Sequence, residues 1–510
     1  MKSAFAEDDT SKANRLFVEA VRLIQLSENL ISDAKKLELI EKALGIITNI
    51  IENYPSSDLA VKLITNEPIG NININQVRAS VESIRNKAAI EICYSDPTPQ
   101  CIFLLALAEV RKLARSARSD GLISIANAQA RLGDFKAAIA TAKMIEEADV
   151  RSNTFSSVIQ YQAEAGNITD AIGNLKLIGS IYDGPYSFVA IGKALAIDGN
   201  LEEAIKYYTL AIEMAKSSNN QAQIACMVTE AKAETLWVDI KVIDDVKKIT
   251  KELLGDVVGS CPDIQFLFAR MSEKFAKNGD TEGALRYMSA TLKDEYKLNV
   301  TIRLAEFLAD LDDVEGAQSF INSALSMVQK EEDSYKRKRA LSDIAKVQAK
   351  IGDFESADIT VAMFENDDYL GRITTDTLAT IAGIKAHKGH INAAFDTLAK
   401  IEQMVEQKFG IKLAYGWLRS RALASIAEAQ ANAGDNKTAK ETFDTAIKLA
   451  MQFPAGSDAG STFVDIAEAQ ARTGDIRAAL DTTKKMTESG HGYHLIDALV
   501  QIAEVQAKAR

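Results

Sequence analysis

The sequence predicts an all-α protein built as a solenoid of helix hairpins, and three observations support that prediction. The 510 residues include only 7 prolines and 27 glycines, and residues that favour helix are prominent throughout. No long run of alternating β-branched and polar residues indicates a strand. A short pattern also recurs along most of the chain, as IANAQARLGDFKAAI at 125–139 and IAEAQARTGDIRAAL at 466–480. Such internal similarity is typical of repeat architectures.

Each copy of the pattern contains a turn in which glycine precedes Asp or Asn. A chain that leaves a helix needs a left-handed residue, which glycine adopts readily, and Asp or Asn caps the helix that follows. The turns recur at intervals of 33 to 45 residues, with one interval of 80. They are centred on Gly133, Gly166, Gly199, Gly279, Gly352, Gly434 and Gly474, with Asp312 and Gly389 at the equivalent places.

Alanine occupies two fixed positions around every turn. It stands three residues before the turn position, as at Ala130 and Ala471, and five residues after it, as at Ala138 and Ala479. Small side chains on both helices allow their backbones to approach closely, as antiparallel packing requires. The recurring unit is therefore a helix-turn-helix hairpin.

These features resemble the tetratricopeptide (TPR) repeats, over about residues 119 to 510. A small residue also lies midway along the first helix of most units, at Ala126, Gly192, Ala305, Ala345, Ala382, Ala427, Ala467 and Ala503. The chain departs from the family pattern where Gln replaces the usual Tyr near the end of that helix, as at Gln129 and Gln470. The resemblance implies a right-handed α-solenoid that acts as a protein-binding scaffold.

The helical pattern changes along the chain and predicts five segments. Residues 1–10 form a flexible tail, and residues 11–117 form a helical N-terminal domain that caps the array. TPR-like repeats occupy 118–216, a degenerate repeat or bend occupies 217–262, and repeats resume over 263–510, ending in a half-repeat. The last helix is expected to cover the end of the solenoid.

The charge of the chain argues against two classes of partner. With 59 basic and 71 acidic residues the net charge is −12, which disfavours nucleic acid and anionic membranes. One basic run, KRKR at 336–339, follows KEED at 330–333. We interpret it as a solvated junction between helices, and the alternative is a basic recognition patch. No stretch reaches the roughly 18 apolar residues of a membrane span.

Four cysteines and the N-terminus bear on the compartment. Cys93 and Cys101 flank a Pro-rich turn and can close a disulfide in an oxidising compartment. Cys226 and Cys261 form either a second pair or two buried thiols. Ala4, Phe5 and Ala6 look like the end of a secretory signal, and a disordered tail is the alternative. We expect an exported or periplasmic protein, with a cytoplasmic one as the other possibility.

The sequence contains no motif that carries catalysis or cofactor binding. It has no P-loop, no dinucleotide-binding glycine pattern, no nucleophile elbow and no HExxH metal motif. The pairs His387/His390 and His491/His494 lack a third ligand at recognisable spacing, so we interpret them as polar turn residues. We therefore expect a protein that is not an enzyme and has no cofactor, metal or catalytic residue.

The working surface of a solenoid is usually the concave face formed by its first helices. If the TPR-like geometry holds, the residue after the midway position faces this groove. We predict a partner-binding site at Asn127, Gln160, Lys193, Glu273, Glu306, Lys346, Glu428 and Glu468. The prediction is a non-enzymatic scaffold that binds a partner protein or peptide in this groove. The alternative is a self-assembling structural protein that stacks through the ends or faces of its solenoid, as a homo-oligomer.

Overall fold

The computed structural model divides the chain into two compact units, Met1–Lys112 with Gln506–Arg510, and Leu113–Val505. It describes residues 9–65, 67–69, 73–74, 76–77, 81, 84, 91, 93–179, 184–215, 224, 227–228, 294–365, 372–409, 416–454 and 459–509. Every regular element within these residues is a helix, so the predicted all-α fold is confirmed. The predicted bend at 217–262 lies outside the described residues, apart from Ile224, Met227 and Val228.

The first unit contains four described helices. They are α1 (Asp9–Glu28), α2 (Asp33–Asn53), α3 (Asp58–Ile64) and α5 (Pro99–Val110). Phe17 of α1 packs with Ile47 and Ile50 of α2 in one core, where the spacing of three and four residues places apolar side chains on one helix face. Cys93 and Cys101 form a disulfide, which confirms the expected pairing. Cys226 and Cys261 lie outside the described residues.

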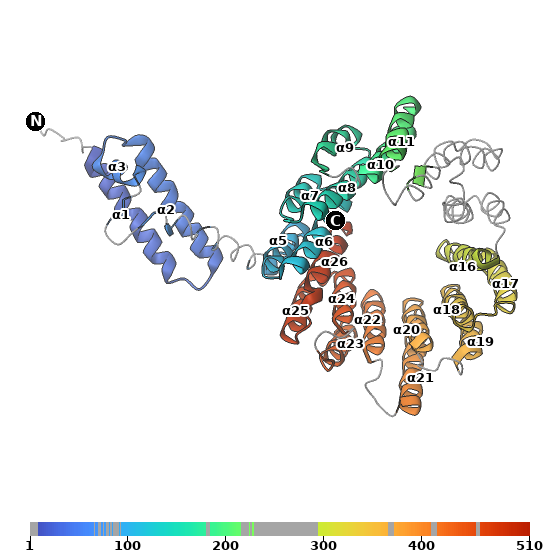
Figure 1. Ribbon diagram of the computed structural model, residues 1–510. Coiled ribbons are helices and arrows are strands. Elements are labelled where there is room, and N and C mark those ends of the chain that lie inside the picture. The colour runs from blue at the N-terminus through green and yellow to red at the C-terminus, as the bar shows by residue number, and fades with distance from the viewer. Residues whose placement is uncertain are drawn as a thin grey trace, which may run out of the picture. The chain divides into compact units, whose positions relative to one another are not determined.

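The second unit is a series of helix hairpins (Figure 1). The first and second helices of each are α6 (Arg115–Arg131) and α7 (Phe135–Ala142), α8 (Ala148–Glu164) and α9 (Ile168–Asn174), α10 (Gly184–Ile197) and α11 (Leu201–Ala215), α16 (Asp294–Asp310) and α17 (Val314–Val328), α18 (Ser334–Lys350) and α19 (Phe354–Glu365), α20 (Arg372–His387) and α21 (Ile391–Phe409), α22 (Gly416–Asn432) and α23 (Asn436–Ala450), and α24 (Ala459–Arg472) and α25 (Ile476–Glu488). A further helix, α26 (Leu495–Lys508), follows.

The turns have the predicted geometry. At Gly434 the backbone φ is +87°, and the Asp435 amide bonds to the Gln430 carbonyl across 3.0 Å, which closes the end of α22. The Asp435 carboxylate then accepts from the Thr438 amide and caps α23. Asp312 takes the left-handed conformation at φ 58°, as its place in the pattern predicts. Gly279 lies outside the described residues.

Packing follows the predicted alanines. The midway residues Ala126, Ala345, Ala427 and Ala467 are all fully buried. Ala126 of α6 packs in one core with Ala142 of α7, its own second helix, and with Phe155 of α8, the next first helix. Helix α22 likewise contacts both α23 and α24. First helices therefore stack on one another and form a continuous face, here called the first-helix face, within each described run of hairpins.

The described residues contain neither a helix long and apolar enough to cross a membrane nor a group of three or more side chains suited to binding a metal ion.

Candidate functional site

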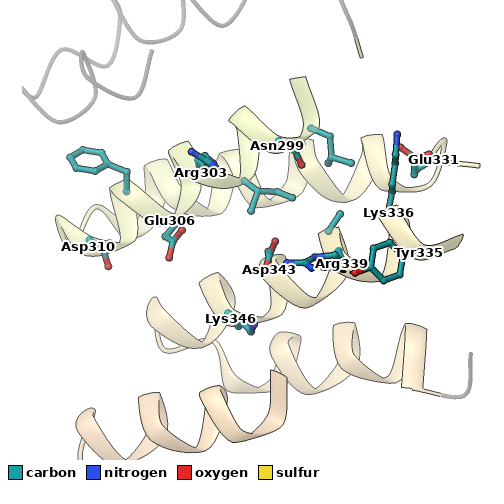
Figure 2. A pocket seen from close by; sticks show the side chains of 14 residues that line it. Asn299, Arg303, Glu306, Asp310, Glu331, Tyr335, Lys336, Arg339, Asp343 and Lys346 are labelled. Carbon is teal, nitrogen blue, oxygen red and sulfur yellow. Dashed lines mark hydrogen bonds between the residues drawn. The ribbon is translucent and has the colours of Figure 1, made fainter. Parts of the chain in front are cut away.

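A groove on the first-helix face, between α16 and α18, is the strongest candidate site (Figure 2). Its volume is about 700 Å³, which is within the range of ligand pockets. Among its lining residues are the predicted site residues Glu306 and Lys346. We refer to it as the α16–α18 groove. The residues that line it are Leu298, Asn299, Ile302, Arg303, Glu306, Phe307, Asp310, Glu331, Tyr335, Lys336, Arg339, Ala340, Asp343 and Lys346.

The start of α18 places the basic run at one end of the groove. The Asp333 carboxylate accepts from the amides of Tyr335 and Lys336 and so caps the helix. Lys336 and Arg339, three residues apart, line the groove because they share one face of the helix. Arg337 instead turns back and donates to the Glu331 carbonyl across 2.9 Å. The basic run is therefore divided between the groove and the preceding loop.

The floor of the groove is apolar. Leu298 and Ile302 of α16 and Ala340 of α18 line it and are each only 5–6% exposed. Burial of these side chains follows from the stacking of the two first helices. The groove therefore combines an apolar floor with charged walls, a composition suited to an amphipathic segment of another protein.

The charged residues at one end of the groove form ion pairs with one another or with neighbouring helices. Lys350 of α18 contacts Glu306 and Asp310 of α16, each across 2.9 Å. Hydrogen bonds to these carboxylates outweigh the effect of burial and raise the pKa of Lys350. Lys346 contacts Asp376 of α20 across 3.0 Å.

Asp343 differs from these residues, because it makes no hydrogen bond or ion pair to the described residues. Its side chain is exposed in the groove. The surrounding protein removes water from the carboxylate and raises its pKa, an effect that Lys346 and Arg339 oppose and that Glu306 and Asp376 reinforce. Arg339 itself contacts the Tyr335 hydroxyl across 3.3 Å. An accessible anionic group thus remains in the middle of the groove.

On the face formed by α20, α22 and α24, the acidic residues do have basic partners, unlike Asp343. Arg472 of α24 donates through Nε and Nη2 to the two carboxylate oxygens of Glu428, both at 2.8 Å, and through Nη1 to Glu468 at 2.6 Å. The hydrogen bonds to Glu428 raise the pKa of Arg472. Arg421 of α22 contacts Asp465 of α24 across 2.7 Å. The acids and bases of this face satisfy one another.

One residue on the preceding helix explains why Asp343 lacks the partner that Asp465 has. Asp343 and Asp465 both stand two residues before the midway alanine of their helices. The cation that binds Asp465, Arg421, stands six residues before the midway alanine of the helix before. At that place before Asp343 the chain has Asn299, a neutral residue that also lines the groove. The vacancy opposite Asp343 is therefore a consequence of sequence.

The predicted site residues occupy different environments. Glu306 and Lys346 line the α16–α18 groove, whereas Glu428 and Glu468 share Arg472. Gln160 and Lys193 are half-buried on α8 and α10. The side-chain oxygen of Asn127 is buried and finds no hydrogen-bond partner among the described residues. Glu273 lies outside the described residues.

Sequence reasoning missed Asp343, Arg339 and Tyr335. It followed a single position per helix, one residue past the midway alanine, whereas the groove also takes residues two and six positions before it. Helical periodicity was the available signal, since residues three and four apart share a face.

Sequence reasoning also missed the role of the Gln that departs from the family pattern. The Gln129 and Gln470 side chains accept hydrogen bonds from Thr141 and Thr482 of their second helices, at 2.8 and 2.7 Å.

A second cavity, of about 680 Å³, lies between α23 and α25 on the opposite side of the hairpins. Its lining includes Lys440, Asp444, Arg477 and Lys485. It contains none of the predicted groove residues, and we regard the α16–α18 groove as the better candidate because an unpaired carboxylate and an apolar floor meet there.

Residues 185–218 match the family model of the tetratricopeptide repeat. They comprise nearly all of α10, the whole of α11 and the turn at Gly199. This hairpin is similar to a tetratricopeptide repeat. Arrays of such repeats present extended surfaces to which other proteins bind.

Comparison with solved structures returns several helical proteins at low identity. A Rap protein complexed with competence and sporulation factor is 14% identical, over 74% of this chain and 98% of that one, with a TM-score of 0.26. Aspartyl phosphate phosphatase F from Bacillus subtilis is 17% identical, over 66% and 94%, with a TM-score of 0.27. A circular tandem repeat protein is 14% identical, over 97% and 96%, with a TM-score of 0.16. With TM-scores this low, none of these likenesses bears on the function of this chain. No curated protein matches the sequence.

Proposed function

We propose that this protein is a non-enzymatic scaffold that binds a segment of a partner protein in the α16–α18 groove. The observation that carries the proposal is the unpaired Asp343 carboxylate above the apolar floor of Leu298, Ile302 and Ala340. TPR-like repeats support a protein partner in general, and the groove supplies the specific surface.

The chemistry of the groove defines the segment that fits it. A Lys or Arg side chain of the partner would pair with Asp343, and an adjacent apolar side chain would cover the floor. The pairing has value because Asp343 is already partly desolvated in the unbound protein, so binding removes less water from it. Arg339 on the wall favours a segment with an acidic residue beside the cation.

Fluorescence anisotropy with the full chain and two labelled peptides tests this proposal. One peptide of about ten residues carries Arg next to Leu in a Gly/Ser background, and the other carries Glu in place of Arg. We expect the Arg peptide to bind more tightly, and Asp343→Asn to weaken its binding by about tenfold, the effect of losing about 1.4 kcal/mol. Asp481→Asn, on the exposed surface of α25, is the matched control and should leave the affinity unchanged. Equal binding of the two peptides, or no effect of Asp343→Asn, would contradict the proposal.

A further inference from the structure

The ion pairs between first helices follow a rule of position. Glu428, one residue past the midway alanine of α22, pairs with Arg472, five residues past that of α24. Glu306 of α16 and Lys350 of α18 stand at the same two positions and pair in the same way across 2.9 Å. In both pairs, an acid one residue past the midway alanine of a first helix binds a base five residues past the midway alanine of the next first helix in the stack.

The same pair recurs between the last and the first repeats of the second unit. Glu504 stands one residue past Ala503 of α26, and Arg131 stands five residues past Ala126 of α6. Their side chains meet at 2.8 Å from Nε and 2.7 Å from Nη2 of Arg131, although 373 residues separate them in sequence. The pair therefore places α26 before α6 in the stack, in the same way that α22 precedes α24. Figure 1 shows the two helices side by side.

Burial of α26 agrees with this placement. Leu499, Ile502 and Ala503 are 0–2% exposed, and the Glu504 residue is 8% exposed, the values of a helix in the interior of the array. The Glu428 residue, its counterpart in α22, is 6% exposed. A first helix at a free end of a solenoid would expose one flank to water. A cavity of only about 60 Å³ remains between the start of α6 and Tyr493, Ile496 and Asp497, which is consistent with a packed interface.

The last turn of α26 is held by a further contact within the first unit. Gln506 donates to the Pro97 carbonyl, two residues before α5 begins. Gln506 occupies the position of Gln129 and Gln470, three residues past the midway alanine, and those residues bond to their own second helices. Gln506 instead contacts the segment that leads into α5.

We propose that α26 docks on α6 as the preceding member of its stack, so that this chain's own last helix occupies the outer flank of its first repeat. The surface that would otherwise receive a second copy is then filled from within the same chain. Stacking of solenoid ends into head-to-tail oligomers requires a free flank on α6, and the docked helix removes it. Release of α26 would expose two complementary surfaces, one on each end of the repeat unit.

Amide hydrogen exchange of the full chain, read at 495–508, tests this inference independently of any partner. We expect Glu504→Arg to accelerate exchange in α26 by about tenfold or more, because two guanidinium groups would face each other in a partly buried site. The charge-exchanged protein, Arg131→Glu with Glu504→Arg, should return exchange to within about twofold of the natural chain. Glu504→Gln provides a milder variant with an intermediate increase, should the Arg variant fold poorly.

The matched control is Glu428→Arg, which disrupts the equivalent pair between α22 and α24 and should leave exchange in α26 unchanged. The inference is overturned if α26 exchanges as fast in the natural chain as in an unstructured peptide, or if Glu504→Arg and Glu504→Gln leave it unaltered. Sedimentation adds a second criterion: a mass that stays monomeric as concentration rises is expected, whereas end-to-end oligomers of the natural chain would overturn the inference.

Discussion

The α16–α18 groove and the face formed by α20, α22 and α24 are built on the same repeat but differ in how they use charge. On the face formed by α20, α22 and α24, Arg421 pairs with Asp465, and Arg472 pairs with Glu428 and Glu468. In the groove, Asp343 keeps an accessible carboxylate because Asn299 stands where a cation would otherwise reach it. A single residue type thus separates a surface whose charges pair with one another from the surface that we propose as the binding site.

The largest expected effect is on the face formed by α20, α22 and α24. Arg472→Met removes the bidentate partner of Glu428, whose side chain is only 8% exposed, and leaves its carboxylate buried without that cation. Loss of one member of a buried pair costs about 3–5 kcal/mol; because Arg472 itself is 42% exposed, we expect about 2–3 kcal/mol, read from urea unfolding followed by circular dichroism. Asp343→Asn is the control and should not destabilise the protein, since no ion pair is broken. Equal losses in the two variants would remove the distinction between the two surfaces.

The next effect comes from giving the groove the missing cation. Asn299→Arg should place a guanidinium opposite Asp343, as Arg421 stands opposite Asp465. We expect binding of the Arg peptide to weaken by at least about tenfold, while stability rises by no more than about 1 kcal/mol, the value of a partly exposed pair. Asn299→Gln is the size control and should bind as the natural chain does. Undiminished binding by Asn299→Arg would show that the vacancy opposite Asp343 is not the determinant.

A smaller effect compares two turns that flank these regions. Asp312 in the turn after α16 has φ 58°, whereas Gly434 in the turn after α22 has φ +87°. Glycine adopts this conformation at no steric cost, so Asp312→Gly should stabilise the protein and Gly434→Ala should destabilise it, each by about 0.5–1 kcal/mol. Thermal unfolding of the two variants measures the difference. Shifts of the same sign would contradict the assignment of these two residues to one turn position.

The smallest effect is the pH dependence of the groove. The surrounding protein removes water from the Asp343 carboxylate and raises its pKa above the ordinary value, so it takes up a proton at a higher pH than a fully solvated Asp does. Binding of the Arg peptide should therefore weaken as pH falls through this raised pKa, and Asp343→Asn should abolish that part of the dependence. Anisotropy titrations from neutral pH downward measure it. An identical pH profile in the natural chain and the variant would remove Asp343 from the binding site.

Local features of the sequence predicted most of the fold. The turns at Gly434 and Asp312 and the buried alanines such as Ala345 follow from interactions between residues close in sequence. The lining of the α16–α18 groove followed from the sequence only in part, because the repeat position identified Glu306 and Lys346 but not Asp343. Whether a charged residue is free depends on which helix lies beside it, and a count along one helix does not contain that information.

The sequence by itself determined the helix hairpin, its turn and the small residues at its contacts, because each depends on residues within about one repeat of one another. The tertiary structure showed which charges meet, because it places the helix that carries Arg421 beside Asp465 and the helix that carries the neutral Asn299 beside Asp343. It also decided that Glu504 meets Arg131 across 373 residues. Such contacts depend on how the hairpins stack over the whole unit, where packing and the exclusion of water act between side chains that no local pattern relates.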